Sequence, residues 1–168
     1  MKKTTRILCA AGLAMGLAGF ATGASAQQGD LQQRGLYAGG GLGWGWSDHD
    51  DDWSWKGLAG WRLNEYLAVQ GFYADLPPIT NGPVRKNIET FGVEGLVSFP
   101  LSQQVAIYGK GGLHNYNDFG SSRDTSWLGG AGAEFAVARN WSVRTEWTHY
   151  NTRTDSVDDI GVQLIYGF

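Results

Sequence analysis

Cysteine, proline and long hydrophobic runs are all scarce in this chain of 168 residues. Cys9 is the single cysteine and prolines number four, so no intramolecular disulfide can hold the fold together. Beyond residue 26 no segment has the continuous apolar run of about 20 residues that a transmembrane helix needs. If the mature chain enters a membrane, it must do so as a closed β-barrel, because only a closed barrel leaves no backbone group unpaired in lipid.

Positive charge is also scarce, since the chain has 13 basic and 16 acidic residues. Three of the basic residues fall within 1–26, so ten basic residues face sixteen acidic ones in the remainder. This acidic balance argues against nucleic acid as a partner. Nothing in the sequence implies a cofactor.

The first 26 residues have the features of a secretory signal peptide. A basic start precedes the apolar stretch 7–20, and 24–26 reads Ala-Ser-Ala, which is a typical cleavage site. An anchoring helix is the alternative, but the apolar stretch is short for spanning a bilayer. We therefore predict a cleaved signal peptide at 1–26, containing Cys9, and a single mature domain at 27–168.

What the chain has in abundance is alternation of apolar and polar residues. In 141–147 every second residue is uncharged, while Arg144 and Glu146 lie between them, and 160–168 alternates in the same way. A period of two indicates strands rather than helices. The uncharged face carries aromatics, which suits a barrel wall with lipid outside and a polar interior.

Eight such segments can be recognised along the chain. Three short turns at 63–65, 100–104 and 139–140 alternate with long polar connections, an asymmetry typical of outer-membrane barrels. A soluble lipocalin-like barrel, the alternative, predicts no such alternation. We therefore predict an all-β, eight-stranded, antiparallel, up-and-down transmembrane β-barrel. The predicted strands are 35–46, 53–62, 66–74, 90–99, 105–113, 126–138, 141–150 and 160–168, and the long loops are 47–52, 75–89, 114–125 and 151–159.

The charged residues of the predicted strands fall on the face opposite the aromatics. Buried charges are costly unless they are paired, so a balanced interior is expected. We predict an interior salt-bridge network of three basic and three acidic side chains. Its members are Lys56, Lys110, Arg144, Glu94, Glu134 and Glu146.

The aromatic residues of the outward face sort by height into two belts, as expected at two lipid–water interfaces. A soluble sandwich with an aromatic core is the alternative, but it would not leave aromatics at both rims. The belt near the long loops comprises Trp44, Trp46, Trp53, Trp55, Tyr73, Trp127 and Trp147, and the belt near the short turns comprises Trp61, Phe99, Trp141, Tyr166 and Phe168.

These segments resemble the small OmpA/OmpX-type outer-membrane barrels, which include porin-family and opacity-like proteins. The similarity is carried by 57–64, 105–110, 132–135, 141–147 and 160–168. The resemblance implies export through the periplasm to the bacterial outer membrane, contact with lipid and lipopolysaccharide, and interior salt bridges that plug the lumen. It also implies that Tyr166 and Phe168 form the signal read by the barrel-assembly machinery. Gln70 stands where relatives often have an acid, which suggests rearranged pairing, through Glu94.

Three functional hypotheses follow. The first is a non-enzymatic barrel with a structural or surface-interaction role, in which the four long loops bind an extracellular ligand. The second is a lipid A-modifying enzyme, which the pattern His149-Tyr150-Asn151 only partly supports. The lipid A deacylase family has a His-x-Ser pair on a late strand, because a nucleophilic serine needs its base adjacent. Here Asn151 stands in place of that serine, and Ser142 lies at the opposite interface. A narrow, low-conductance pore is a further alternative, although eight strands enclose an interior just filled by side chains.

The third hypothesis is a contact with metal ions or lipopolysaccharide through the loops. The acidic run Asp48, His49, Asp50, Asp51 and Asp52 offers oxygen ligands for a divalent cation, but it lacks the ligand spacing and glycine of a dedicated loop. We therefore expect a solvated hairpin tip and no metal site. The basic loop residues are either contacts for lipopolysaccharide phosphates or ordinary surface charges; they are Arg85, Lys86, Arg123 and Arg153.

Overall fold

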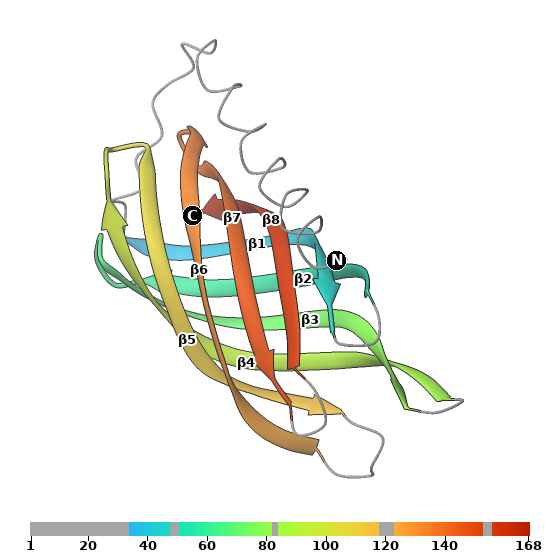
Figure 1. The fold of residues 1–168 in the computed structure, drawn as a ribbon. Coiled ribbons are helices and arrows are strands. Elements are labelled where there is room, and N and C mark those ends of the chain that lie inside the picture. Colours follow the sequence, from blue (N-terminus) through green and yellow to red (C-terminus); the bar gives the residue numbers. More distant parts are fainter. Residues whose placement is uncertain (1–33, 48–50, 82–83, 118–122, 153–155) are drawn as a thin grey trace.

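The computed structural model describes residues 34–47, 51–81, 84–117, 123–152 and 156–168. Within them, eight antiparallel strands form a closed barrel in which each strand pairs with its sequence neighbours and β8 closes onto β1 (Figure 1). The predicted fold class is therefore confirmed, whereas the predicted signal peptide lies outside the described residues. The strands are β1 Gly35–Trp46, β2 Asp51–Arg62, β3 Leu67–Asn81, β4 Val84–Pro100, β5 Val105–Asn117, β6 Arg123–Ala138, β7 Trp141–Asn151 and β8 Ser156–Gly167.

The alternation of side chains along each strand determines which residues face the lumen and which face outward. Along β7, the even-numbered residues from Ser142 to Tyr150 are buried in the lumen, while the odd-numbered residues are exposed or half-buried on the outside. A one-residue slip of register would reverse the two faces of a strand. The described part of the chain has no helix long and apolar enough to cross a membrane.

The predicted long loops are shorter than expected, because the strands continue into them. β3 and β4 occupy most of 75–89, β5 and β6 occupy both ends of 114–125, β2 begins inside 47–52, and β8 begins inside 151–159. Polar residues do not end a strand that extends beyond the lipid, because water can hydrate its outward-facing polar side chains there. Prediction from polarity alone therefore made these strands too short at the long-loop end.

The β3–β4 hairpin extends beyond both of its neighbours. β2 pairs with β3 only as far as Asp75, and β5 pairs with β4 only as far as Thr90, so the rest of the hairpin is a two-stranded ribbon (Figure 1). Its pairing shifts register between Leu76 and Ile79, which flank two prolines. Proline lacks a backbone donor and is tolerated at bulges and strand edges, so the prolines did not prevent a strand here.

Two glycines make room for interior tyrosines. A Cβ atom at Gly60 would lie 2.6 Å from Cζ of Tyr37, and one at Gly132 would lie 2.6 Å from Oη of Tyr108. Each tyrosine pairs with its glycine across adjacent strands. Each ring therefore packs over its glycine, and the hydroxyls of Tyr37 and Tyr108 reach Gln70 and Glu146 in the lumen.

Candidate functional site

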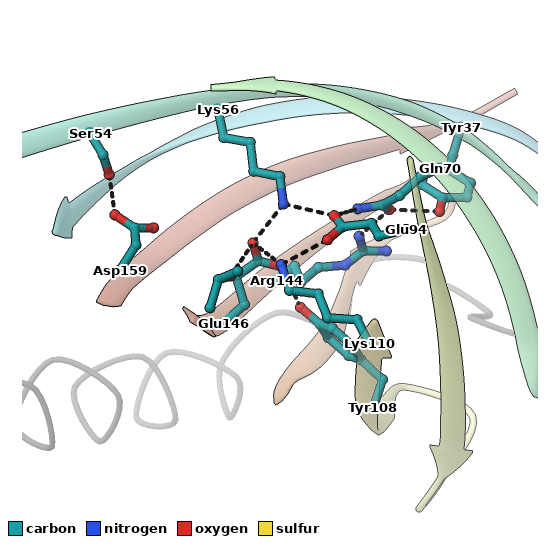
Figure 2. A network of polar contacts seen from close by, with 11 residues as sticks. Tyr37, Ser54, Lys56, Gln70, Glu94, Tyr108, Lys110, Arg144, Glu146 and Asp159 are labelled. Carbon is teal, nitrogen blue, oxygen red and sulfur yellow. Dashed lines mark hydrogen bonds and ion pairs between the residues drawn. The ribbon is translucent and has the colours of Figure 1, made fainter. Parts of the chain in front are cut away.

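Four charged side chains from four strands meet in the middle of the lumen (Figure 2). Nζ of Lys56 lies 2.8 Å from Oε1 of Glu94 and 3.1 Å from Oε1 of Glu146. Nζ of Lys110 lies 2.7 Å from the same oxygen of Glu146 and 3.3 Å from Oε2 of Glu94. We call these four residues the central quartet; each lysine contacts both glutamates, so the quartet is neutral.

The central quartet is closed off from water. Exposed side-chain fractions are 8% for Lys56, 1% for Glu146 and zero for the other two members. Tyr108 adds a hydrogen bond of 2.9 Å from its hydroxyl to Glu146, and the ammonium of Lys56 lies 4.5 Å from the centre of the Phe72 ring. In such surroundings a charge without a partner is costly, so one-to-one neutralisation is the stable arrangement.

A second group of charges lies closer to the short turns, and we call it the short-turn cluster. Glu134 accepts hydrogen bonds from Arg144, 3.0 Å away, from Arg62, 2.9 Å away, and from the hydroxyl of Ser142, 2.6 Å away. This cluster has two guanidinium groups for one carboxylate. Among the described contacts, the cluster therefore lacks the one-to-one balance of the central quartet.

Gln70 joins the two groups. Its Nε2 donates to Oε1 of Glu94, while its Oε1 accepts hydrogen bonds from the hydroxyl of Tyr37 at 2.8 Å and from Nη1 of Arg144 at 3.0 Å. A glutamate here would add a negative charge beside Glu94. The neutral amide instead links the quartet to the cluster through one continuous chain of hydrogen bonds (Figure 2).

Sequence reasoning placed six charges in the lumen, and the structure brings all six together. Among the residues that the structure describes, it also adds Arg62 and Asp159, which were missed. Arg62 was assigned to the end of its strand, and Asp159 was assigned to a loop. Arg62 stands six residues after Lys56 and so shares its face, which could have revealed it. Asp159 can be assigned to the lumen only because β8 begins at Ser156, earlier than predicted. Its carboxylate accepts a hydrogen bond from Ser54.

The lumen toward the long hairpins is filled by rings and hydroxyls. His114 is 1% exposed; its Nδ1 lies 2.8 Å from the hydroxyl of Thr90 and its Nε2 lies 3.0 Å from the carbonyl of Asn151. The rings of Tyr116 and Tyr150 pack against it, each with its centre 5.5 Å from that of the imidazole. Side chains therefore occupy the lumen at this level as well as around the quartet.

The outer wall carries the aromatic residues that the sequence assigned to two belts. Trp53 is 67% exposed at one end and Phe99 is 62% exposed at the other, while Trp46 and Tyr166 are half-buried. Tyr166 packs between Trp141 and Phe168, at ring-centre distances of 4.9 and 5.1 Å. The remaining members of the predicted girdle are all exposed; they are Trp44, Trp55, Trp61, Trp127, Trp141 and Trp147.

His149 lies on the outer wall and not in a serine-containing site. Its Nδ1 is 2.9 Å from a carboxylate oxygen of Asp158, and the Trp127 ring packs 5.6 Å from the imidazole. Ser142 lies inside the lumen, where it donates to Glu134. The two residues weighed for lipid A chemistry are therefore on opposite faces of β7.

The contact between His149 and Asp158 also shows that charged residues do occur at outward positions where β7 and β8 approach the long-hairpin end.

The acidic run at 48–52 is only partly covered, because 48–50 lie outside the described residues. Asp51 and Asp52 are the first two residues of β2. Among the residues that the structure describes, no group of three or more His, Cys, Asp or Glu side chains is placed to hold a metal ion.

A closed, lipid-facing wall around a charged lumen defines the class of transmembrane β-barrels. The sequence family described as outer membrane protein beta-barrel domain matches residues 12–168. The chain belongs to this family and is a bacterial outer-membrane β-barrel protein. Long hairpins accordingly mark the extracellular end and short turns the periplasmic end.

Solved structures with the same fold include three bacterial proteins. Ail, the attachment invasion locus protein of Yersinia pestis, solved in complex with the heparin analogue sucrose octasulfate, is 16% identical with a TM-score of 0.58, covering 81% of this chain and all of Ail. Neisserial surface protein A is 17% identical, with a TM-score of 0.59, covering 80% and 97%. The N-terminal barrel of Pseudomonas aeruginosa OprF is 14% identical, with a TM-score of 0.53, covering 80% and 100%. No curated protein sequence matches the chain.

Proposed function

We propose that this protein is a non-enzymatic outer-membrane barrel whose plugged lumen makes it a rigid scaffold for its extracellular hairpins. The observation that carries the proposal is the central quartet, in which four buried charges from four strands neutralise one another across the lumen. Such cross-links hold the strands in place, and loops on a rigid scaffold are where binding specificity usually resides. Its role is then structural or surface-interacting.

Planar-bilayer recordings test the plugged lumen against a narrow pore. We expect no steady conductance at neutral pH from the refolded protein, because a lumen of this size is filled by side chains. A Glu146→Ala variant, which removes volume and a negative charge from the quartet, serves as the sensitised comparison. Large, stable channels from the unmodified protein would refute the plug.

The charge of the extracellular segments favours a cationic partner. The four predicted loop segments contain eleven acidic and four basic residues, and ten acidic residues remain when Asp159, which lies in the lumen, is left out. Ail, in contrast, was solved with a polysulfated, anionic compound. Opposite charges steer encounter and like charges oppose it. We therefore infer that this chain binds basic surfaces in preference to sulfated polysaccharides.

Binding to vesicles that contain the folded protein tests this partner. Polylysine should bind and heparin should not, and raising the salt concentration from 0.05 to 0.5 M should release the polylysine because surface charges are then screened. A variant with Asp48, Asp50, Asp51 and Asp52 changed to Asn should bind less polylysine. Heparin binding at low salt would contradict the inference.

Export and assembly complete the proposal. Residues 1–26 are removed on export, Tyr166 and Phe168 serve as the signal to the assembly machinery, and the outer wall contacts lipid and lipopolysaccharide. N-terminal sequencing of the protein from outer-membrane fractions should begin at Gln27. Phe168→Ala should lower the amount of folded barrel in those fractions, measured by heat-modifiable gel migration.

Lipid A modification is the alternative activity, and the positions of His149 and Ser142 on opposite faces of β7 disfavour it. Overproduction of the protein should leave the mass of lipid A unchanged. Loss of an acyl chain that depended on His149 would overturn the non-enzymatic assignment.

A further inference from the structure

A small cleft opens at the periplasmic rim, where β1 begins and β8 ends. Its volume is about 50 Å³. Three backbone-level contacts build the rim beside it: the Gly167 amide donates to the Asn140 carbonyl at 2.9 Å, the Asn140 side chain donates to the Gly167 carbonyl at 2.8 Å, and the Phe168 amide donates to the Leu36 carbonyl at 3.0 Å. These contacts join the start of β1, the end of β8 and the β6–β7 turn, and residues of β2, β6 and β7 complete the lining.

The charged side chains that line the cleft are mostly positive. Arg34 and Arg139 lie at its exposed mouth, and Arg62 and Glu134 form its inner wall. Glu134 is already shared between Arg62 and Arg144, so it does not neutralise the two arginines at the mouth. The cleft therefore presents an excess of guanidinium groups, which bind phosphate with charge-assisted, often paired hydrogen bonds.

The cleft is also open to the lipid-facing side of the wall. Leu36, Trp141 and Phe168 line it, and their exposed fractions are 54%, 43% and 75%. Trp141 and Phe168 belong to the aromatic belt at the periplasmic interface, where phospholipid headgroups meet acyl chains. A molecule in the cleft would thus touch guanidinium groups at one end and hydrocarbon-facing side chains at the other.

The size of the cleft limits what can enter it. A cavity needs roughly 10–15 Å³ to hold one water. A cleft of about 50 Å³ therefore admits a phosphate-sized group but not a whole lipid. The acyl chains of a lipid would remain outside, along the apolar wall. Charge and shape together select a phospholipid headgroup over a bulky soluble ligand.

We propose that this cleft binds the phosphate group of an anionic phospholipid from the periplasmic leaflet, with Arg34 and Arg139 as the primary contacts. Arg62, on the inner wall of the cleft, places a further guanidinium group behind them. This site is independent of the role proposed for the extracellular hairpins, because it lies at the other end of the barrel.

Native mass spectrometry of the refolded barrel in detergent tests the proposal, with short-chain phosphatidylglycerol as the probe and phosphatidylcholine of the same chain length as the neutral comparison. The double variant Arg34→Gln/Arg139→Gln should weaken phosphatidylglycerol binding at least tenfold, since each guanidinium supplies a charge-assisted contact. Arg34→Lys/Arg139→Lys should recover most of the affinity. Heat-modifiable migration establishes that each variant is folded.

Arg85→Gln/Arg123→Gln is the matched control, because it removes the same charge from the extracellular end. It should leave phosphatidylglycerol binding unchanged. Equal losses in both double variants would overturn the site, as would undiminished binding by Arg34→Gln/Arg139→Gln. Binding of inorganic phosphate without binding of phosphatidylglycerol would overturn the assignment to a lipid.

A measurement on the unmodified protein covers the case in which the variants do not fold. Spin-labelled phosphatidylglycerol should broaden the amide NMR signals of Asn140 and Gly167, while that of Gly43, nearer the extracellular end, stays sharp. Broadening at both ends to the same degree would show non-specific lipid contact and contradict the proposal.

Discussion

The central quartet and the short-turn cluster solve the same problem of buried charge in different ways. In the quartet, two lysines face two glutamates and the side chains are at most 8% exposed. In the cluster, one glutamate serves two arginines, and the outer one, Arg62, has a side chain that is 15% exposed and lines an open cleft. The central quartet is therefore shielded from solvent, whereas the short-turn cluster is partly in contact with it.

This difference teaches that charge balance in a barrel lumen is a local requirement. A charge at the dry centre has only protein partners to offset its lost hydration, so every member needs an opposite charge. A charge near the mouth keeps part of its hydration and is screened by salt. The balance of charges in the lumen can thus be less strict at its ends than in its middle.

The largest effect should come from breaking the quartet. Glu146→Gln leaves Lys56 and Lys110 sharing one carboxylate, and we expect the free energy of unfolding to fall by about 3–5 kcal/mol, the cost of an unpaired buried charge. Urea unfolding in lipid vesicles, followed by tryptophan fluorescence, measures it. The control Asp51→Asn, at an exposed strand end, should change the value by less than about 0.5 kcal/mol. Similar losses in the two variants would refute the local requirement.

Removing the buried arginine of the cluster should cost less. Arg144→Gln takes one donor from Glu134 and one from Gln70, but Glu134 keeps Arg62 and Ser142. We expect a loss of about 2–3 kcal/mol, typical of hydrogen bonds to a charged group. The same unfolding assay applies, and a loss larger than that of Glu146→Gln would reverse the proposed ranking of the two groups.

Crowding the wall beside the quartet should have a smaller effect. Gly132→Ala would place a methyl group against the Thr145 carbonyl of the neighbouring strand and against the Tyr108 ring, whose hydroxyl donates to Glu146. Overpacking of this kind costs about 1–3 kcal/mol. Gly109→Ala is the matched control, because a Cβ atom there meets nothing within 4 Å. An equal response of the two glycines to alanine would mean that crowding at Gly132 is unimportant.

The smallest effect should come from Arg62→Gln. The residue is partly exposed and Glu134 retains Arg144, so we expect a loss of about 1 kcal/mol or less, as for ion pairs near solvent. The loss should shrink further in 0.5 M salt, whereas that of Glu146→Gln should not. A large, salt-independent loss would place Arg62 in the dry part of the lumen.

The alternation of side chains was enough to predict eight strands, their faces and six interior charges. Strand ends were harder, because 75–89 and 151–159 look like loops by polarity but are largely strand. Arg62 and Asp159 were missed at such ends. In the observed pairing both lysines contact both glutamates, and Gln70 links the two groups. This pairing depends on how far each strand is staggered against the next, which cannot be deduced from any one strand.

The sequence by itself determined that the wall has a charged inner face and, away from its extracellular end, an uncharged outer one, because each strand separately alternates its side chains with a period of two. Only the tertiary structure decided which charges meet, which group is dry, and that a positively lined cleft lies beside Arg62 at the periplasmic rim. Those features arise from strands distant in sequence whose stagger is set by closure of the whole barrel. Closure is a property of all eight strands together, so the partners of a charge cannot be read from its own strand.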